Sequence, residues 1–367
     1  MSTLSRRNFL HGSALVGVSV AAAAMTPMAA AAVAPKKCRT VSEVFSMSEV
    51  DMAKNSEVVQ SAYDTIVKSV KKIHNPSLRS TVLNIIQNPA PTIVRGDEAA
   101  IMASLKKAGL LNVNAKSVFP RIEDKTRSPQ PFWSAPGSGY GSHHAYPGGL
   151  ATHTALNVVS AEALYENYRH INNLELDWDD AVGGEILHDL HKPWVFQWEK
   201  DHSCRVEQSL AGTGEHHVLS IAESIKRGLP SSFVVAQACA HDHPSSKQGE
   251  ALVVGWLKAA SIIAGVDPVL HGLIAPDGKT LPLPRRMEGY VVHLADHDWV
   301  ISSSACQWSV QALKELAQEQ YGITEAAKFN AFRNYVLANL TAMRLYGILS
   351  AQGRKAFAAA VARVIKL

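Results

Sequence analysis

His188 and Asp189 stand side by side at the end of an apolar segment, just before Lys192 and Pro193. An imidazole next to a carboxylate offers nitrogen and oxygen donors at one point, which suits a divalent transition-metal ion. On its own, such a pair is more often a hydrogen-bonded helix end than a pair of ligands. The pair therefore predicts a metal site only where other donors of the chain can join it.

Other histidines are numerous and are concentrated in one part of the chain. The sequence has 16 His, and all except His11 and His74 lie within residues 143–297. They form clusters at the ends or on the inner faces of expected helices: His153, His216-His217, His241-Asp242-His243 and Asp296-His297-Asp298. Helical bundles build metal sites from one or two inward ligands per helix. Taken together, the clusters predict a common metal site rather than separate core histidines bonded to backbone carbonyls.

The order of these residues resembles the HD superfamily of metal-dependent phosphohydrolases. The stretch His143-His-Ala-Tyr-Pro-Gly-Gly-Leu-Ala-Thr-His-Thr154, followed by His-Asp-x-x-Lys at 188–192, is most similar to the HD domain of bacterial 3′-5′ exoribonuclease-type proteins. The resemblance covers residues 73–265 and extends toward residue 300. Because no nucleic-acid-binding OB segment precedes it, we do not carry over the exoribonuclease activity, and nucleic-acid binding stays undecided.

The resemblance also implies a set of metal ligands: His153, His188, Asp189, His216 and His241. The choice of His216 follows from the Gly-His-x-x-x-Gly motif of the family. Helical phase alone favours the neighbouring His217, which shares a face with Ile221 and Ile225. Both histidines therefore stay open at this stage.

The last carboxylate ligand of the family has no direct counterpart here. It would fall at Ser261, and a serine cannot replace a carboxylate ligand. Asp296 is the better candidate and Asp267 the weaker one. Asp296 requires an insertion, residues 266–289, before the last ligand helix.

This ligand set predicts one or two divalent transition-metal ions, with Fe, Mn, Zn, Co and Ni all compatible. Two ions sharing Asp189 could activate water and bind a phosphoryl oxygen. The resemblance places Lys192 toward the substrate phosphate, although a solvated cation at a helix end is an equal alternative. No Ser-His-Asp or Cys-His signature and no phosphate-binding Gly-rich loop is visible. We therefore expect a metal-dependent phosphohydrolase, with Asp189 and Lys192 as catalytic residues and a small phosphoester or nucleotide as substrate.

Two other functions fit the same ligands. One is a di-iron oxygenase of the HD type, and the other is a non-catalytic, metal-stabilised binding protein. Trp194 and Trp198 follow the His-Asp pair and could stack a base, but aromatic residues at this spacing more often belong to the core.

Hydrophobic periodicity predicts an all-α fold, an HD-domain helical bundle with additional N- and C-terminal helices. Expected helices cover residues 42–52, 55–72, from 76, 97–108, 149–167, 179–188, 216–227, 231–240, 250–264, 290–321, 325–345 and 355–365. The long 290–321 segment could break. Residues 112–141 are rich in Pro and Gly and form the best internal boundary. The predicted organisation is a signal at 1–34, a helical segment and loop at 35–130, an HD domain at 131–310 and C-terminal helices at 311–367.

The N-terminus predicts export. Arg6 and Arg7 precede Phe9-Leu10, an apolar run and a small-residue stretch, which resembles a twin-arginine signal. We expect cleavage, passage through the twin-arginine translocase and a periplasmic or secreted protein. No later segment is apolar for the length of a membrane span. Removal of the two arginines leaves 34 basic against 32 acidic residues, so the balance gives no sign of a nucleic-acid footprint.

Overall fold

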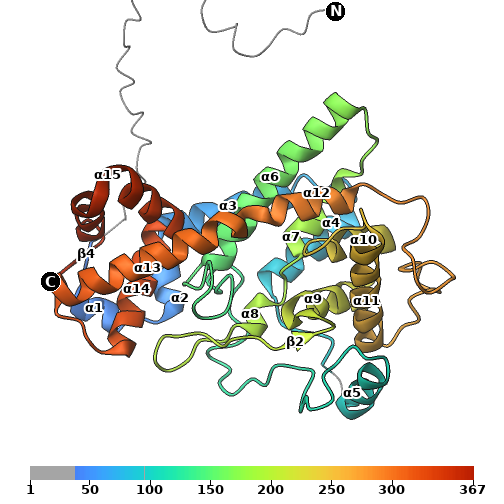
Figure 1. Cartoon of the computed structure of the whole chain (residues 1–367), viewed down its shortest axis with the longest axis horizontal. Coiled ribbons are helices and arrows are strands. Elements are labelled where there is room, and N and C mark those ends of the chain that lie inside the picture. Colours follow the sequence, from blue (N-terminus) through green and yellow to red (C-terminus); the bar gives the residue numbers. More distant parts are fainter. Residues whose placement is uncertain (1–37, 95) are drawn as a thin grey trace, which may run out of the picture. The chain divides into compact units, whose positions relative to one another are not determined.

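The computed structural model describes residues 38–94 and 96–367, and helices dominate this part of the chain (Figure 1). The predicted all-α class is confirmed. Strands occur there only as two short pairs: β1 (Arg39–Thr40) lies parallel to β4 (Ile365–Lys366), and β2 (Ser209–Leu210) lies antiparallel to β3 (Thr213–Gly214). The predicted signal at 1–34 falls outside the described residues. None of the helices described has the length and hydropathy to cross a bilayer.

The first helices precede a long loop. They are α1 (Val41–Phe45), α2 (Glu49–Lys54), α3 (Glu57–Val70), α4 (Pro76–Gln87) and α5 (Glu98–Lys107). The single helix expected at 42–52 is wrong, because the Ser48 side chain accepts a hydrogen bond from the Asp51 amide and starts a second helix there. After α5 the chain runs without helix to residue 148, as predicted for residues 112–141.

The central helices carry most of the histidines. They are α6 (Gly149–Asn172), α7 (Trp178–Leu187), the short α8 (Lys192–Val195), α9 (Glu215–Lys226), α10 (Ser231–Ala238), α11 (Lys247–Ala264) and α12 (Glu288–Ala295). Helix α6 packs against α3, α7 and α12, while α7 packs against α10 and α9 against α11. Of the expected insertion at residues 266–289, residues 266–287 are irregular and the last two residues begin α12.

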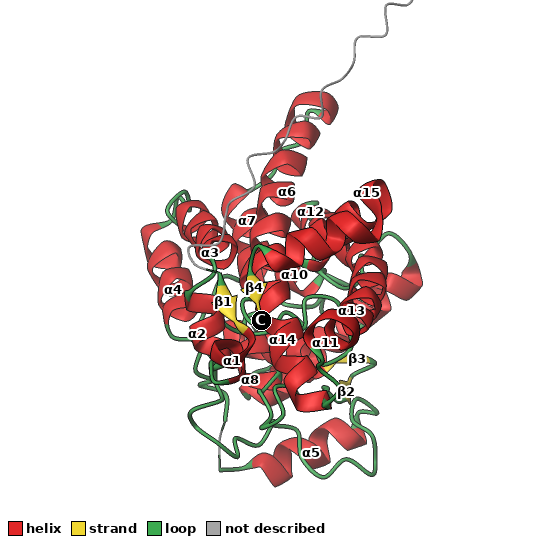
Figure 2. Cartoon of the chain, turned by 90° about the vertical axis from the view of Figure 1, so that its left-hand side faces the viewer, coloured by secondary structure: helices red, strands yellow, loops and turns green. Residues whose placement is uncertain are grey.

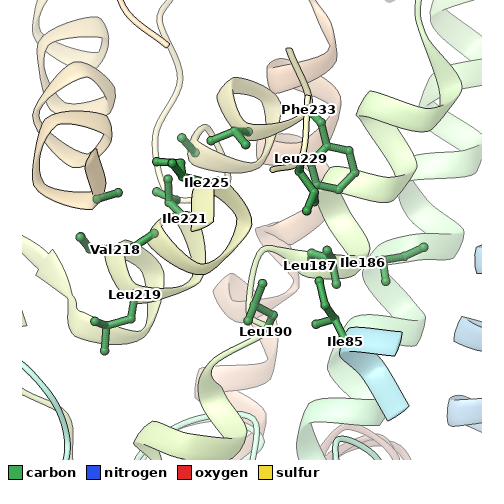
Figure 3. Packing of buried hydrophobic residues seen from close by; sticks show 14 of the residues in the cluster. Ile85, Ile186, Leu187, Leu190, Val218, Leu219, Ile221, Ile225, Leu229 and Phe233 are labelled. Atoms are coloured by element: carbon green, nitrogen blue, oxygen red, sulfur yellow. The ribbon is translucent and has the colours of Figure 1, made fainter. Parts of the chain in front are cut away.

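A hydrophobic core holds these helices together. Leu187 and Leu190 are buried on either side of the His188-Asp189 pair, and in Figure 3 they lie near Ile85 of α4 and Ile186 of α7. Apolar residues of α9 and α10 complete the same cluster, among them Phe233. The His-Asp pair is therefore anchored by burial of its apolar neighbours.

The C-terminal helices form a second hydrophobic cluster. A 3-10 turn (η2, Asp296–Asp298) is followed by α13 (Trp299–Tyr321), α14 (Ala326–Leu340) and α15 (Ala342–Ala362). The expected 290–321 helix breaks at η2, and the expected 325–345 helix ends early because Thr341 has a positive φ of 54°. Val44 and Met52 from α1 and α2 join this cluster, and β1 lies next to β4 (Figure 2). The predicted boundaries at residues 130 and 310 stay predictions.

Candidate metal centre

The start of α6 fixes the position of His153. Gly148 has a φ of 80°, and a Cβ at this residue would lie 2.4 Å from a methyl group of Val59. A Cβ on Gly149 would lie 1.9 Å from the carbonyl oxygen of His144. The two glycines therefore let the preceding loop fold tightly onto the helix, which explains why this motif needs them. The His144 ring consequently lies 5.1 Å from the His153 ring between centroids.

The His188-Asp189 pair lies at the end of α7, where His188 follows the last helical residue. The Nδ1 of His188 lies 2.7 Å from the carbonyl oxygen of Glu185. When Nδ1–H donates to that carbonyl, the lone pair of Nε2 is left free to bind a metal. Both His188 and Asp189 are fully buried.

A first group of donors surrounds one oxygen of Asp189. Its Oδ2 lies 3.0 Å from His188 Nε2 and 3.2 Å from His153 Nε2. Asp296 Oδ1 lies 3.1 Å from His153 Nε2 and 3.4 Å from His188 Nε2. Helix α6, the end of α7 and the turn η2 thus bring together side chains from three distant parts of the sequence.

A second group surrounds the other oxygen of the same aspartate. His216 Nε2 lies 3.2 Å from Asp189 Oδ1. Ligand atoms of Asp189, His216 and His241 all lie within 4.8 Å of one another. His241 Nε2 is also 3.7 Å from Asp296 Oδ2. Asp189 therefore lies between two groups of donors, as a bridging carboxylate would.

These donors fit a bound metal better than a hydrogen-bonded cluster. His188 Nε2, His216 Nε2 and Asp189 Oδ1 are buried without a hydrogen-bond partner. Buried polar atoms without partners are rare, and their free energy cost is offset when they coordinate a cation. Nitrogen and carboxylate donors in this combination suit a transition-metal ion.

Side chains around the ligands hold them in place. Glu207 Oε2 lies 2.5 Å from His216 Nδ1, and it accepts a hydrogen bond from the His216 amide. The Asn157 amide donates to Asp296 Oδ1 over 2.9 Å. Sequence reasoning missed both residues. Asn157 stands one helical turn after His153, which could have identified it, whereas Glu207 lies on an irregular segment with no periodicity to reveal it.

Lys192 belongs to this site. Its Nζ lies 2.5 Å from Asp189 Oδ2, and the side chain is almost fully buried. The alternative of a solvated cation at a helix end is therefore wrong. Its ammonium is the cation closest to the carboxylate that the two donor groups share.

The structure separates the alternatives that the sequence left open. His217 lies outside the donor groups: its Nε2 is 3.2 Å from the carbonyl oxygen of Ala238, and its ring stacks on His241 at 4.1 Å. Asp267 is exposed and accepts backbone hydrogen bonds from its own turn. Geometry therefore places His216 and Asp296, rather than these two, among the converging donors.

The charges in the site match the ligand assignment. Burial alone would raise the pKa of Asp189, but His188 and Lys192 hold that pKa well below its usual range. Burial would lower the pKa of His216, but Glu207 and Asp189 raise it to about 9. Burial, together with the neighbouring histidines, keeps the pKa of His241 well below its usual range. Burial would also lower the pKa of His188, but nearby carboxylates raise it well above its usual range. Asp189 is thus ionised and His241 neutral, while a metal ion would displace the protons of His188 and His216.

A cavity of about 410 Å³ opens over the donors. Its lining includes His153, Lys192 and His241. Trp194 and Trp198 are only 1% and 3% exposed and do not line it, so their assignment to the core is confirmed and the base-stacking alternative is wrong. A larger cavity of about 800 Å³, lined in part by Trp198, contains none of the donor groups.

Comparison with known proteins supports a hydrolase. No family model and no solved structure matches the chain. The chain is 24% identical over 208 residues to dihydroneopterin 2′,3′-cyclic phosphate phosphodiesterase of Methanocaldococcus jannaschii, an alignment that covers 54% of this chain and 68% of that protein. The chain is thus a distant homologue of a phosphodiesterase. This similarity favours phosphoester hydrolysis over the oxygenase and the non-catalytic alternatives.

Proposed function

We propose that this chain is a metal-dependent phosphodiesterase that cleaves its substrate by attack of an activated water. The observation that carries the proposal is the position of Asp189, whose two oxygens face two different groups of histidines. The site lies under a cavity, as substrate access requires. The similarity to a phosphodiesterase supports the reaction type.

The donors form two sets that share Asp189: His153, His188 and Asp296 for one ion, and His216 and His241 for a second. Divalent ions held there would lower the pKa of a bound water and offset the negative charge on phosphoryl oxygens. Glu207 keeps the His216 ring oriented through its Nδ1. Lys192 adds a positive charge beside Asp189 and would bind a substrate oxygen as a point charge.

We propose a small phosphodiester as the substrate rather than a polymer. A cavity of about 410 Å³ lies within the range of pockets for small ligands. The homologue is named for a 2′,3′-cyclic phosphate of dihydroneopterin, so cyclic phosphodiesters of this kind are the first candidates.

We further propose that the protein is exported by the twin-arginine route and acts in the periplasm or outside the cell. The support is the Arg6-Arg7 pair, the apolar run after it and the small-residue stretch that follows. Cell fractionation of the wild type and of an Arg6→Lys, Arg7→Lys variant tests this proposal. Equal amounts of both proteins in the exported fraction would contradict it.

The decisive experiment combines metal analysis with a hydrolysis assay on the full chain. We expect one or two transition-metal ions per chain, and metal-dependent cleavage of bis(p-nitrophenyl) phosphate and of dihydroneopterin 2′,3′-cyclic phosphate. A His188→Ala variant loses both activities. Oxygen consumption with an iron spectrum would instead indicate an oxygenase, and bound metal without turnover a binding protein.

A further inference from the structure

Two half-exposed aromatic side chains stand at the mouth of the metal cavity. Tyr140 is 42% exposed and Trp299 is 47% exposed, and both line the cavity together with His153 and Lys192. They come from different elements, the loop before α6 and the first residue of α13. Aromatic side chains combine a flat apolar face with little conformational freedom, which suits them to bind another ring.

The orientation of Tyr140 is fixed by the C-terminal helices. Its hydroxyl donates to Asn330 Oδ1 over 2.8 Å, and the guanidinium of Arg333 lies 4.9 Å from its ring centroid. Both partners are buried residues of α14. The preceding Gly139 packs closely against the segment around Val206. A Cβ on Gly139 would lie 3.3 Å from the Cα of Val206. Tyr140 is therefore held in place before any ligand binds, which lowers the entropic cost of binding.

The position of Trp299 is linked to the metal centre. It follows directly after η2, the turn that contains the donor Asp296. Its ring lies 6.0 Å from the ring of His297 between centroids. Trp299 follows Asp296 by three residues, and both line the same cavity. A group bound against Trp299 therefore lies close to the donors that would hold the phosphoester.

We propose that Trp299, with Tyr140 as a second wall, binds a flat heteroaromatic ring of the substrate while the phosphoester lies over the His/Asp donors. This inference rests on the proposed function and adds the residues that select the organic part of the substrate. The cavity lining has the matching polarity, since it combines buried charged donors with half-exposed aromatic side chains. Stacking accepts any planar ring, so a purine and a pterin are both members of the class.

The test compares phosphate esters that carry an aromatic ring with one that does not. Isothermal titration calorimetry on the metal-loaded full chain measures Kd for adenosine 5′-monophosphate, for ribose 5-phosphate and for a pterin phosphate. We expect the wild type to bind a ring-bearing ligand more tightly than ribose 5-phosphate. A Trp299→Ala variant loses about 5- to 160-fold of affinity for the ring-bearing ligand, as stacking on one aromatic side chain predicts. Affinity for ribose 5-phosphate stays unchanged.

Two further variants serve as controls, one for the loss of an exposed tryptophan elsewhere on the helix and one for the aromatic character of residue 299. Trp308 lies on the same helix, is 62% exposed and is not among the residues that line the cavity, so Trp308→Ala should bind all ligands like the wild type. Trp299→Phe should recover part of the lost affinity. Comparison of the two Kd values shows whether the site prefers a purine or a pterin ring.

The inference is overturned if neither ring-bearing ligand binds more tightly than ribose 5-phosphate. It is also overturned if Trp299→Ala weakens all ligands equally. Hydrolysis is measured separately on the same preparations. Ring-selective binding without turnover would support the inference and contradict the proposed function, whereas turnover without ring selectivity would do the opposite.

Discussion

Two histidine clusters lie close together in this protein and differ in what surrounds them. In the metal centre, four histidines converge with Asp189 and Asp296. In the neighbouring cluster, the rings of His243, His293 and His297 are 4.4 Å apart from one to the next. Among the described residues, these three belong to no group of three donors close enough to hold one ion.

In both clusters Nδ1 of a histidine lies near a backbone carbonyl oxygen: His293 near Ala240, His297 near His293 and His188 near Glu185. The difference lies at the other ring nitrogen. In the metal centre, Nε2 of His188 faces oxygens of Asp189 and Asp296 at 3.0 and 3.4 Å. The density of histidines along the chain therefore does not identify a site. Carboxylates among the rings and buried nitrogens without partners do.

The strongest test of this comparison is a pair of substitutions, Asp189→Asn and His293→Ala. Because Asp189 contributes to both donor groups, we expect Asp189→Asn to lower metal content and to reduce kcat/KM by more than about 100-fold. His293→Ala should leave both values close to those of the wild type. Elemental analysis and hydrolysis kinetics measure the two effects. Equal loss in both variants would show that the two clusters act as one site.

Metal removal should act on stability through the same donors. A ligand that binds only the folded state stabilises it by about 2.7 kcal/mol at a hundred times its Kd. We therefore expect a chelator to lower the Tm of the wild type and of His293→Ala by the same few degrees. The Tm of His188→Ala should not respond. Differential scanning calorimetry with and without chelator gives the comparison, and a chelator-insensitive wild type would contradict it.

A smaller effect is expected from Glu207→Gln. The glutamine can still contact His216 but no longer carries the negative charge that favours a strongly basic imidazole. Loss of such a supporting partner typically lowers metal affinity about 10- to 100-fold. Competition with a chromogenic chelator measures the affinity. An unchanged metal affinity would mean that Glu207 does not act through His216.

The metal centre could be predicted in part from the sequence because its strongest signals are local. His153 lies in a glycine-containing motif, and the His-Asp pair stands at a helix end. The sequence could not decide between His216 and His217 as the ligand. Helical phase identifies only the histidine on the apolar face with Ile221, which is the one that turns into the core and not the one that faces Asp189. The histidine turned into the core is His217, which packs under His241, while His216 faces Asp189.

Residues outside periodic segments were beyond sequence reasoning. Glu207 and Tyr140 lie on irregular loops, where side-chain direction follows from tertiary contacts. The same holds for the fold: α1 and α2 pack with the C-terminal helices, although more than 240 residues separate them from α13. Pairings over such distances depend on the complementarity of whole surfaces, which hydrophobic periodicity does not specify.

His191 provides the smallest expected effect on the metal centre and the last test of the comparison. It is two residues from Asp189, yet its Nε2 lies 3.3 Å from Glu223 Oε2. Burial would raise the pKa of Glu223, but hydrogen bonds from His191 and Thr92 lower it from 4.5 to about 2. Because the folded-state pKa lies below the unfolded one, ionised Glu223 stabilises the protein above pH 4.5, and this contribution is lost as the pH falls toward 2.

We therefore expect Glu223→Gln to lower the free energy of unfolding at pH 7 and to flatten its decline between pH 4.5 and 2, while metal content stays unchanged. Urea unfolding across this pH range and elemental analysis measure the two quantities. Loss of metal from a folded Glu223→Gln variant would show that the His191–Glu223 pair supports the donors. The distinction between paired and converging histidines would then fail at His191, because an imidazole whose Nε2 is paired with its own carboxylate should not contribute to metal binding.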